Sequence, residues 1–119
     1  MAEIPAEIPK RGLFREAVEY YRTPRAQHEH SPNWFLTRSI DLLATYDSYR
    51  FVDMISPHPL LMIAGSDADT LYFSEDAIKN AQEPKELFIV PGKSHIDLYD
   101  QTEGVVPKLT EFFTQHLQV

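Results

Sequence analysis

Two polar loops carry the residues of this chain that could do acid–base chemistry. Each loop follows a run of apolar residues and contains a glycine. The first loop holds Asp67 and Asp69, and the second holds His95. A histidine can exchange a proton near neutral pH, and a carboxylate bonded to one ring nitrogen leaves the other free to act as a general base. The two loops therefore predict two parts of a hydrolytic site, a base and its orienting acid.

The apolar runs before these loops are typical of buried parallel strands. Residues 59–64 and 86–90 are almost continuously apolar and lack the alternation of a half-exposed strand. Between them a helix is expected over 74–81, with its first residue as the N-cap and with Glu75 and Asp76 in the first turn. This order predicts a β-α-β unit with parallel strands and a right-handed connection. The carboxyl ends of such strands lie at one edge of the sheet, so the two polar loops should be neighbours.

Further helices are expected on both sides of this unit. Apolar residues at three- and four-residue spacing predict helices over 13–22 and 103–117. A serine followed by a proline, a common start of a helix, predicts another helix over 31–45. A short helix over 47–54, capped by its first residue, is expected before the first strand. The apolar residues expected to pack there are Phe51, Met54 and Ile55.

Length and composition limit the class of protein. The 119 residues amount to one domain or a piece of one. A hydrophobic content of 43%, with 12% aromatic residues, indicates a packed core rather than a disordered chain. Prolines disfavour helical backbone in the residue before them, so we expect an extended lead-in over 1–12. Residues 13–119 would then form a single α/β segment.

The charge and the cysteine content exclude several partners. A net charge of −7 disfavours nucleic acid, because no basic face is available to neutralise phosphates. The chain has no cysteine, which excludes disulfides and thiolate metal sites. The first ten residues lack the apolar stretch of a signal peptide, and no apolar run approaches the roughly 20 residues that span a bilayer. We therefore expect a cytoplasmic protein that binds neither nucleic acid nor membrane.

The stretch from residue 57 to residue 100 closely resembles the C-terminal part of an α/β-hydrolase. It is most similar to the dienelactone-hydrolase-like and polyketide-transferase-like branch of that superfamily. The resemblance extends from about residue 14 to about residue 117 and implies an incomplete sheet, two parallel strands with flanking helices. The segments that carry it are 20–25, 59–66, 84–87 and 95–100.

The resemblance also implies roles for the polar residues. In this superfamily the catalytic triad follows the chain order nucleophile, acid, histidine. His95 is then the base, and an aspartate of the first loop is the acid. The superfamily places that aspartate three residues past the glycine, where this chain has Ala68. Either Asp69 or Asp67 would serve, and Asp69 is preferred because a small loop adjustment brings it to the expected place.

The nucleophile has no counterpart in this sequence. The superfamily carries it in a Gly-x-Ser-x-Gly elbow. The chain's glycines, at positions 12, 65, 92 and 104, do not have that spacing, so we interpret neither Ser66 nor Ser94 as a nucleophile. The expected function is that of a fragment of a serine hydrolase or acyltransferase that acts on an ester, a lactone or a thioester. The alternative is a non-catalytic interaction or assembly module derived from a hydrolase.

Partners and cofactors follow from the same pattern. Two strands make a poor sheet alone, and an unpaired apolar edge favours association. We expect a homo-oligomer or a complementing N-terminal hydrolase part, and a small-molecule acyl substrate in the complete protein. No cofactor and no metal are expected. His28 and His30, with His58 or His95, are conceivable metal ligands, but no third ligand stands near the first pair in sequence.

Overall fold

The computed structural model describes residues 12–31 and 34–117, and the chain divides into two units, Met1–Ser48 and Tyr49–Val119. The extended lead-in expected over 1–12 lies almost wholly outside the described residues. The helices, the short 3₁₀ helices (η) and the strands are, in chain order, α1 (Leu13–Tyr21), α2 (Ser39–Ala44), η1 (Val52–Ile55), β1 (Leu60–Gly65), α3 (Leu71–Asn80), β2 (Lys85–Val90), η2 (Asp97–Tyr99) and α4 (Val105–His116).

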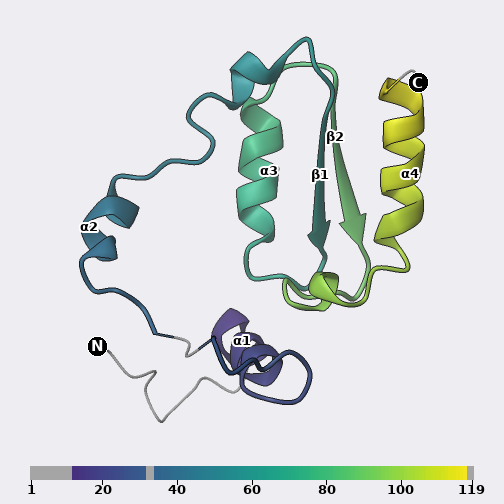
Figure 1. Ribbon diagram of the computed structural model, residues 1–119. Coiled ribbons are helices and arrows are strands. Elements are labelled where there is room, and N and C mark those ends of the chain that lie inside the picture. The colour runs from purple at the N-terminus through teal and green to yellow at the C-terminus, as the bar shows by residue number, and fades with distance from the viewer. Residues whose placement is uncertain (1–11, 32–33, 118–119) are drawn as a thin grey trace. The chain divides into compact units, whose positions relative to one another are not determined.

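The second unit is a small α/β structure built on β1 and β2. The two strands are parallel and in register from Leu60 opposite Lys85 to Gly65 opposite Val90. The connecting helix α3 packs on both strands, and α4 lies on the opposite face of the sheet (Figure 1). The predicted β-α-β order and the parallel pairing are therefore confirmed. They follow from two apolar strands that are each covered on both faces.

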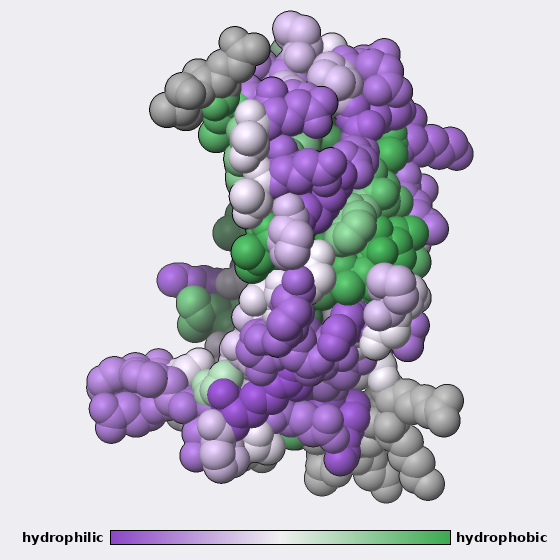
Figure 2. All heavy atoms as spheres, turned by 90° about the vertical axis from the view of Figure 1, so that its right-hand side faces the viewer, coloured by the Kyte–Doolittle hydropathy of each residue, from purple (hydrophilic) through white to green (hydrophobic). Residues whose placement is uncertain are grey.

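Among the described residues of the second unit, the buried apolar ones are alanines, valines and one isoleucine, and none is aromatic. Ala77 of α3 is fully buried, which lets the helix approach the sheet closely, and Ile96 after β2 is only 2% exposed. Larger apolar side chains stay at the surface, among them Val106 and Phe113 of α4, which are 54% and 49% exposed. Figure 2 shows apolar residues at the surface on the side where α4 lies. The described residues of this unit do not cover their own apolar surface.

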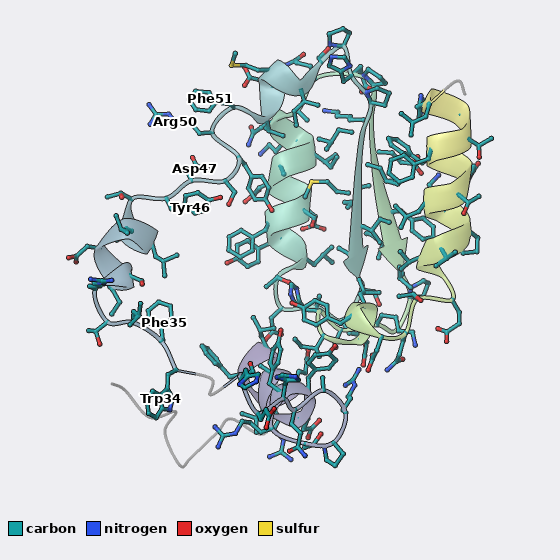
Figure 3. The ribbon with its side chains drawn as sticks, viewed as in Figure 1. Trp34, Phe35, Tyr46, Asp47, Arg50 and Phe51 are labelled. Carbon is teal, nitrogen blue, oxygen red and sulfur yellow. The ribbon has the colours of Figure 1, made fainter. Side chains whose placement is uncertain are left out.

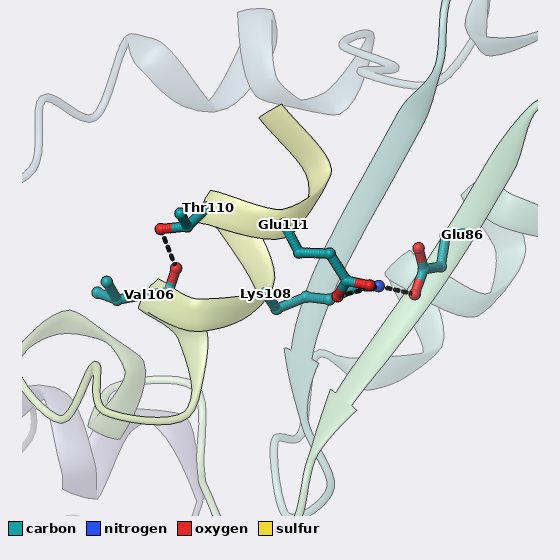
Figure 4. A network of polar contacts seen from close by, with 5 residues as sticks. All are labelled: Glu86, Val106, Lys108, Thr110 and Glu111. Atoms are coloured by element: carbon teal, nitrogen blue, oxygen red, sulfur yellow. Dashed lines mark hydrogen bonds and ion pairs between the residues drawn. The ribbon is translucent and has the colours of Figure 1, made fainter. Parts of the chain in front are cut away.

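Helix α4 is joined to β2 by a charged contact on the face away from α3. Lys108 Nζ lies 2.6 Å from Glu86 Oε1 and 3.5 Å from Glu111 Oε2 (Figure 4). The Glu86 carboxylate, as a hydrogen-bond acceptor, raises the pKa of Lys108 above its usual value of 10.5. The helix predicted over 103–117 is confirmed with slightly shorter bounds, and Pro107 stands in its first turn, where its missing N–H has no cost.

The helix predicted over 31–45 is wrong for most of its length. Pro32, its expected first helical residue, lies outside the described residues, and 34–38 is loop and turn. Trp34 and Phe35 point out from this loop (Figure 3) and are 64% and 48% exposed. None of the residues of α2 is buried. An apolar pattern forms a stable helix only where a surface accepts it, and a short helix without packing is marginal.

The short helix predicted over 47–54 is also wrong, because turns and η1 replace it. Residues three apart share a face in a 3₁₀ helix. Val52 is buried and Ile55 is 37% exposed, whereas Phe51 and Met54 are 64% and 72% exposed. Phe51 and its neighbour Arg50 project outward in Figure 3. All three residues expected to pack before the first strand are thus exposed, and the buried residue of η1 is Val52.

Helix α3 begins at Leu71, three residues earlier than the sequence predicted. Glu75 and Asp76 therefore lie beyond its first turn, and that turn contains no acidic residue. The N-cap is Thr70, and its side chain makes no hydrogen bond to the helix. This start leaves a loop of only five residues, 66–70, between β1 and α3.

Candidate functional site

The loops that follow β1 and β2 lie against each other at the carboxyl end of the sheet, as the sequence predicted. The Asp67 N–H donates to the Lys93 carbonyl oxygen at 3.0 Å. The Gly92 N–H donates to Ser66 Oγ at 2.8 Å, and the Ser66 hydroxyl donates to Asp67 Oδ1 at 2.7 Å. These bonds join the loop that carries the aspartates to the loop that carries His95.

Gly65 is the point of closest approach between the two loops. A Cβ at this position would lie 2.0 Å from the Lys93 carbonyl oxygen and 2.9 Å from the Ser94 carbonyl oxygen. Both are backbone atoms, which cannot rotate away as a flexible side chain could. The glycine allows the loop after β2 to rest directly on the end of β1.

Asp97 holds the loop that carries His95. Its Oδ2 accepts the Ser94 N–H at 3.2 Å, and Ser94 Oγ accepts the Asp97 N–H at 3.3 Å. Gln101 Nε2 donates to Asp97 Oδ1 at 2.9 Å, and Lys93 Nζ donates to Gln101 Oε1 at 2.5 Å. These bonds make Asp97 a local cap of the loop.

Both ring nitrogens of His95 are hydrogen-bonded to hydroxyl groups. Nδ1 lies 2.8 Å from Thr70 Oγ1, and Nε2 lies 2.9 Å from Tyr99 Oη. The rings of His95 and Tyr99 also meet edge to face, with centroids 5.4 Å apart. Within residues 12–31 and 34–117 these are the hydrogen-bond partners of the imidazole. A neutral imidazole has one donor and one acceptor, and each hydroxyl can play either role.

The two predicted acids stand elsewhere on the same loop. Asp67 and Asp69 are exposed, and neither carboxylate is hydrogen-bonded to His95. In their place a threonine hydroxyl stands at Nδ1, the ring nitrogen that an acid would hold. The assignment of the acid to Asp69 or Asp67 stays a prediction.

Sequence reasoning identified neither Thr70 nor Tyr99 as a partner of His95. A threonine before a helix normally indicates an N-cap, so its type and position gave no sign of a second use. Tyr99 follows His95 by four positions in sequence, and a turn and the 3₁₀ helix η2 occupy that interval.

A cavity of about 520 Å³ opens beside His95. Most of its lining is apolar and comes from β1, from α3 and from the segment around η2, with no residue of β2. Since β2 pairs with one edge of β1 and contributes no lining residue, we place the cavity at the carboxyl end of β1, beside its other edge. The lining residues are Tyr49, Ile63, Ala64, Gly65, Ala68, Thr70, Phe73, Ser74, His95, Leu98, Tyr99 and Val105.

The backbone of β1 is open along this same edge. The N–H groups of Leu60 and Ser66 donate toward β2, each at 3.0 Å. Backbone groups alternate in direction along a strand, so the N–H groups of Leu61 and Ile63 point to the opposite edge. The part of the chain that the structure describes places no strand there. The site therefore has one open side, next to the imidazole.

The described residues form neither a metal-binding cluster nor a membrane-spanning helix. No group of three or more His, Asp or Glu side chains there is arranged to hold a metal ion. The rings of His28 and His30 are 5.3 Å apart, and the His30 N–H donates to His28 Nδ1 at 3.2 Å. No described helix combines the length and apolar character needed to cross a membrane.

Comparison with known proteins finds longer relatives. No family model matches the chain. Uncharacterized protein PA2218 from Pseudomonas aeruginosa is 40% identical over 104 residues, which cover 83% of this chain and 28% of the relative. Uncharacterized protein YcjY from Escherichia coli is 36% identical over 108 residues, which cover 87% of this chain and 35% of the relative. The chain thus spans about a third of the length of the curated relatives it matches.

A solved structure shares the fold. The crystal structure of the hypothetical protein PA2218 from Pseudomonas aeruginosa superposes with a TM-score of 0.77 at 37% sequence identity. The match covers 92% of this chain and 36% of that protein. The arrangement of the α/β unit is therefore that of one part of a larger protein.

Proposed function

We propose that this chain corresponds to the C-terminal part of an α/β-hydrolase of the dienelactone-hydrolase-like branch and supplies the general base of an acyl-transfer site. The observation that carries the proposal is the position of His95. Its imidazole stands in a cavity at the carboxyl end of β1, on a loop held by Asp97. Ligands of open α/β sheets bind outside the carboxyl ends of the strands, and a base must reach its substrate there.

The nucleophile would come from a segment that this chain does not contain. The curated relatives are about three times as long as the stretch they share with it. A parallel strand added along the open edge of β1 would pair with the N–H groups of Leu61 and Ile63. Its own carboxyl-end loop would then stand beside His95, where a Gly-x-Ser-x-Gly elbow would present its serine. In this proposal the complementing segment is the N-terminal part of a hydrolase, because a second copy of this chain would occupy the edge of β1 without supplying the elbow.

The proposed chemistry is acyl transfer from an ester, a lactone or a thioester. His95 Nε2 takes the proton of the serine hydroxyl as the oxygen attacks the acyl carbon, and then gives that proton to the leaving group. Asp69 or Asp67 is the acid that the resemblance implies, whereas in this structure the Thr70 hydroxyl stands at Nδ1. Among the described residues no Lys, Arg, Asp or Glu lines the cavity, so its walls suit a neutral, largely apolar acyl group. A cytoplasmic location belongs to the same proposal.

A non-catalytic module remains the second proposal, and one observation favours it. Both ring nitrogens of His95 are hydrogen-bonded to hydroxyls of this chain, so the imidazole is satisfied without a serine nucleophile. Such a module would use the open edge of β1 for assembly alone. DNA directly upstream that encodes a Gly-x-Ser-x-Gly segment in frame would favour the enzyme, and its absence would favour the module.

The decisive experiment uses a chimera in which this chain replaces the matching part of the Pseudomonas aeruginosa PA2218 protein. We expect the chimera to hydrolyse p-nitrophenyl acetate or butyrate. His95→Ala should lower kcat/KM on the order of 10⁴–10⁶-fold, as in other triads that lose their histidine. His58→Ala is the matched control, because this histidine is exposed and lies outside the cavity. Turnover close to wild type in the His95→Ala chimera would remove the proposal.

The isolated chain provides a complementary test with a fluorophosphonate probe read by intact mass. The probe phosphonylates only a serine that a base and an oxyanion hole activate, and it releases fluoride. We expect no adduct, since the nucleophile is proposed to lie outside the chain. A stoichiometric adduct that disappears in His95→Ala would show instead that the chain assembles a working site from one of its own serines.

A further inference from the structure

We propose that Thr70, rather than an aspartate, is the positioning residue of His95. Its hydroxyl holds the imidazole as the tautomer that carries the proton on Nδ1 and leaves Nε2 able to accept one. The importance of that tautomer rests on the proposed function, because a general base needs an unprotonated Nε2. The hydrogen bonds on which the assignment is built do not depend on it.

The side chain of Thr70 does not cap helix α3. Thr70 is the N-cap residue of α3, where a threonine oxygen normally accepts a backbone N–H of the first turn. Its side chain makes no such bond. Instead Oγ1 lies 2.8 Å from Nδ1 of His95, a residue 25 positions later in the chain. The helix gives up a stabilising contact, and the imidazole gains a fixed partner.

The second hydroxyl decides which nitrogen carries the proton. A phenol is a stronger acid than an aliphatic alcohol and is therefore the better hydrogen-bond donor. The two hydrogen bonds are stronger when the Tyr99 hydroxyl donates to Nε2, at 2.9 Å, and the Nδ1–H donates to Thr70 Oγ1. The opposite arrangement requires the threonine to donate and the phenol to accept. The network therefore favours the Nδ1–H tautomer.

The loop leaves little freedom for an aspartate to take the place of Thr70. Residues 66–70 are the whole connection between β1 and α3. The Ala68 N–H donates to the Gly65 carbonyl at 3.2 Å, and the Leu71 N–H donates to the Ala68 carbonyl at 3.0 Å. A backbone rotation that moved Asp69 to the imidazole of His95 would break these two turn hydrogen bonds. The threonine already stands within hydrogen-bond distance.

The test is a long-range ¹H–¹⁵N correlation spectrum of the histidine rings of this chain, recorded at mildly alkaline pH. The His95 signals are assigned by their disappearance in His95→Gln. Exposed His58 provides an internal reference for an imidazole in solvent, which prefers the Nε2–H form. We expect His95 to show a protonated Nδ1 and an unprotonated Nε2. An Nε2–H form of His95 in the wild-type chain would overturn the proposal, with no variant needed.

Variants then separate threonine from aspartate. Thr70→Val keeps the shape of the side chain and should shift His95 toward the Nε2–H form, whereas Thr70→Ser should keep the wild-type tautomer. Asp67→Asn and Asp69→Asn should leave the spectrum of His95 unchanged. A tautomer change in either asparagine variant, with none in Thr70→Val, would assign the orienting role to an aspartate and refute ours. The readout needs no nucleophile, so a chimera without esterase activity would refute the proposed function and leave this assignment standing.

Discussion

Gly65→Ala should separate the two loops of the candidate site. The added methyl would lie 2.0 Å from the Lys93 carbonyl oxygen and 2.6 Å from its carbonyl carbon. An ordinary contact begins at 3.4 Å, and the obstructing atoms are backbone. The loop that carries His95 must therefore move away from the end of β1 by more than an ångström.

The cost of this movement has two parts. Forcing an extra methyl into a closed site typically costs about 1–3 kcal/mol. The displacement also strains the bonds that join the loops, from the Asp67 N–H to the Lys93 carbonyl and from the Gly92 N–H to Ser66 Oγ. Each is worth about 1 kcal/mol. We expect a total loss of roughly 3 kcal/mol in the free energy of unfolding.

Urea unfolding followed by far-UV circular dichroism measures this loss. With a slope of about 1–3 kcal/mol per molar, the midpoint should fall by roughly 1–3 M. Gly92→Ala is the matched control, because its φ of +66° has a conformational cost but nothing lies within 4 Å of the added Cβ. That cost is about 1–2 kcal/mol, so its midpoint should fall by less. Equal midpoints for the two variants would refute the claim that Gly65 is required by the approach of the second loop.

Two further predictions concern α4 and the edge of β1. Because its contact with Glu86 raises the pKa of Lys108, the stability this contact adds is fully present below the unfolded value of 10.5 and is lost as pH rises through the folded value. Lys108→Met should thus lower the urea midpoint well below pH 10.5 and change it little well above, and an equal loss at both pH values would contradict the role of the charge. The isolated chain should sediment as an oligomer, because the open edge of β1 offers the N–H groups of Leu61 and Ile63 to another strand. A monodisperse monomer that unfolds cooperatively would contradict this.

The β-α-β unit could be predicted because its signals are local. Each strand is a short apolar run that ends at a glycine-bearing loop, and the chain between them has the length of a crossover helix. The parallel pairing and the meeting of the two polar loops then follow from topology. Gly65 shows the limit of this reasoning, because the carbonyl that requires a glycine there belongs to Lys93, 28 positions away in sequence.

The helix expected over 31–45 failed for the opposite reason. Its apolar side chains predict a surface to pack against, and the described residues of its own unit do not provide one. Ile40 and Leu43 of this segment are 53% and 54% exposed. Amphipathic spacing predicts which face of a helix would be buried, but not whether a surface is present to cover that face. Only Ser39–Ala44 keeps a helical backbone.

The identity of the orienting residue depends on where α3 begins. With a start at Ser74, the loop after β1 would be long enough for Asp69 to swing toward the histidine, and the sequence argument for Asp69 relied on that adjustment. The observed start at Leu71 makes Thr70 the N-cap and shortens the loop after β1 to residues 66–70. The N-cap of a helix that follows a strand lies at the carboxyl end of that strand. In a parallel sheet this position is next to the loop that follows the neighbouring strand. An error of three residues in a helix boundary is thus enough to move the predicted partner of His95 from a carboxylate to a hydroxyl. The difference is chemical, since a hydroxyl can select the tautomer of the imidazole but cannot supply the negative charge that stabilises the imidazolium.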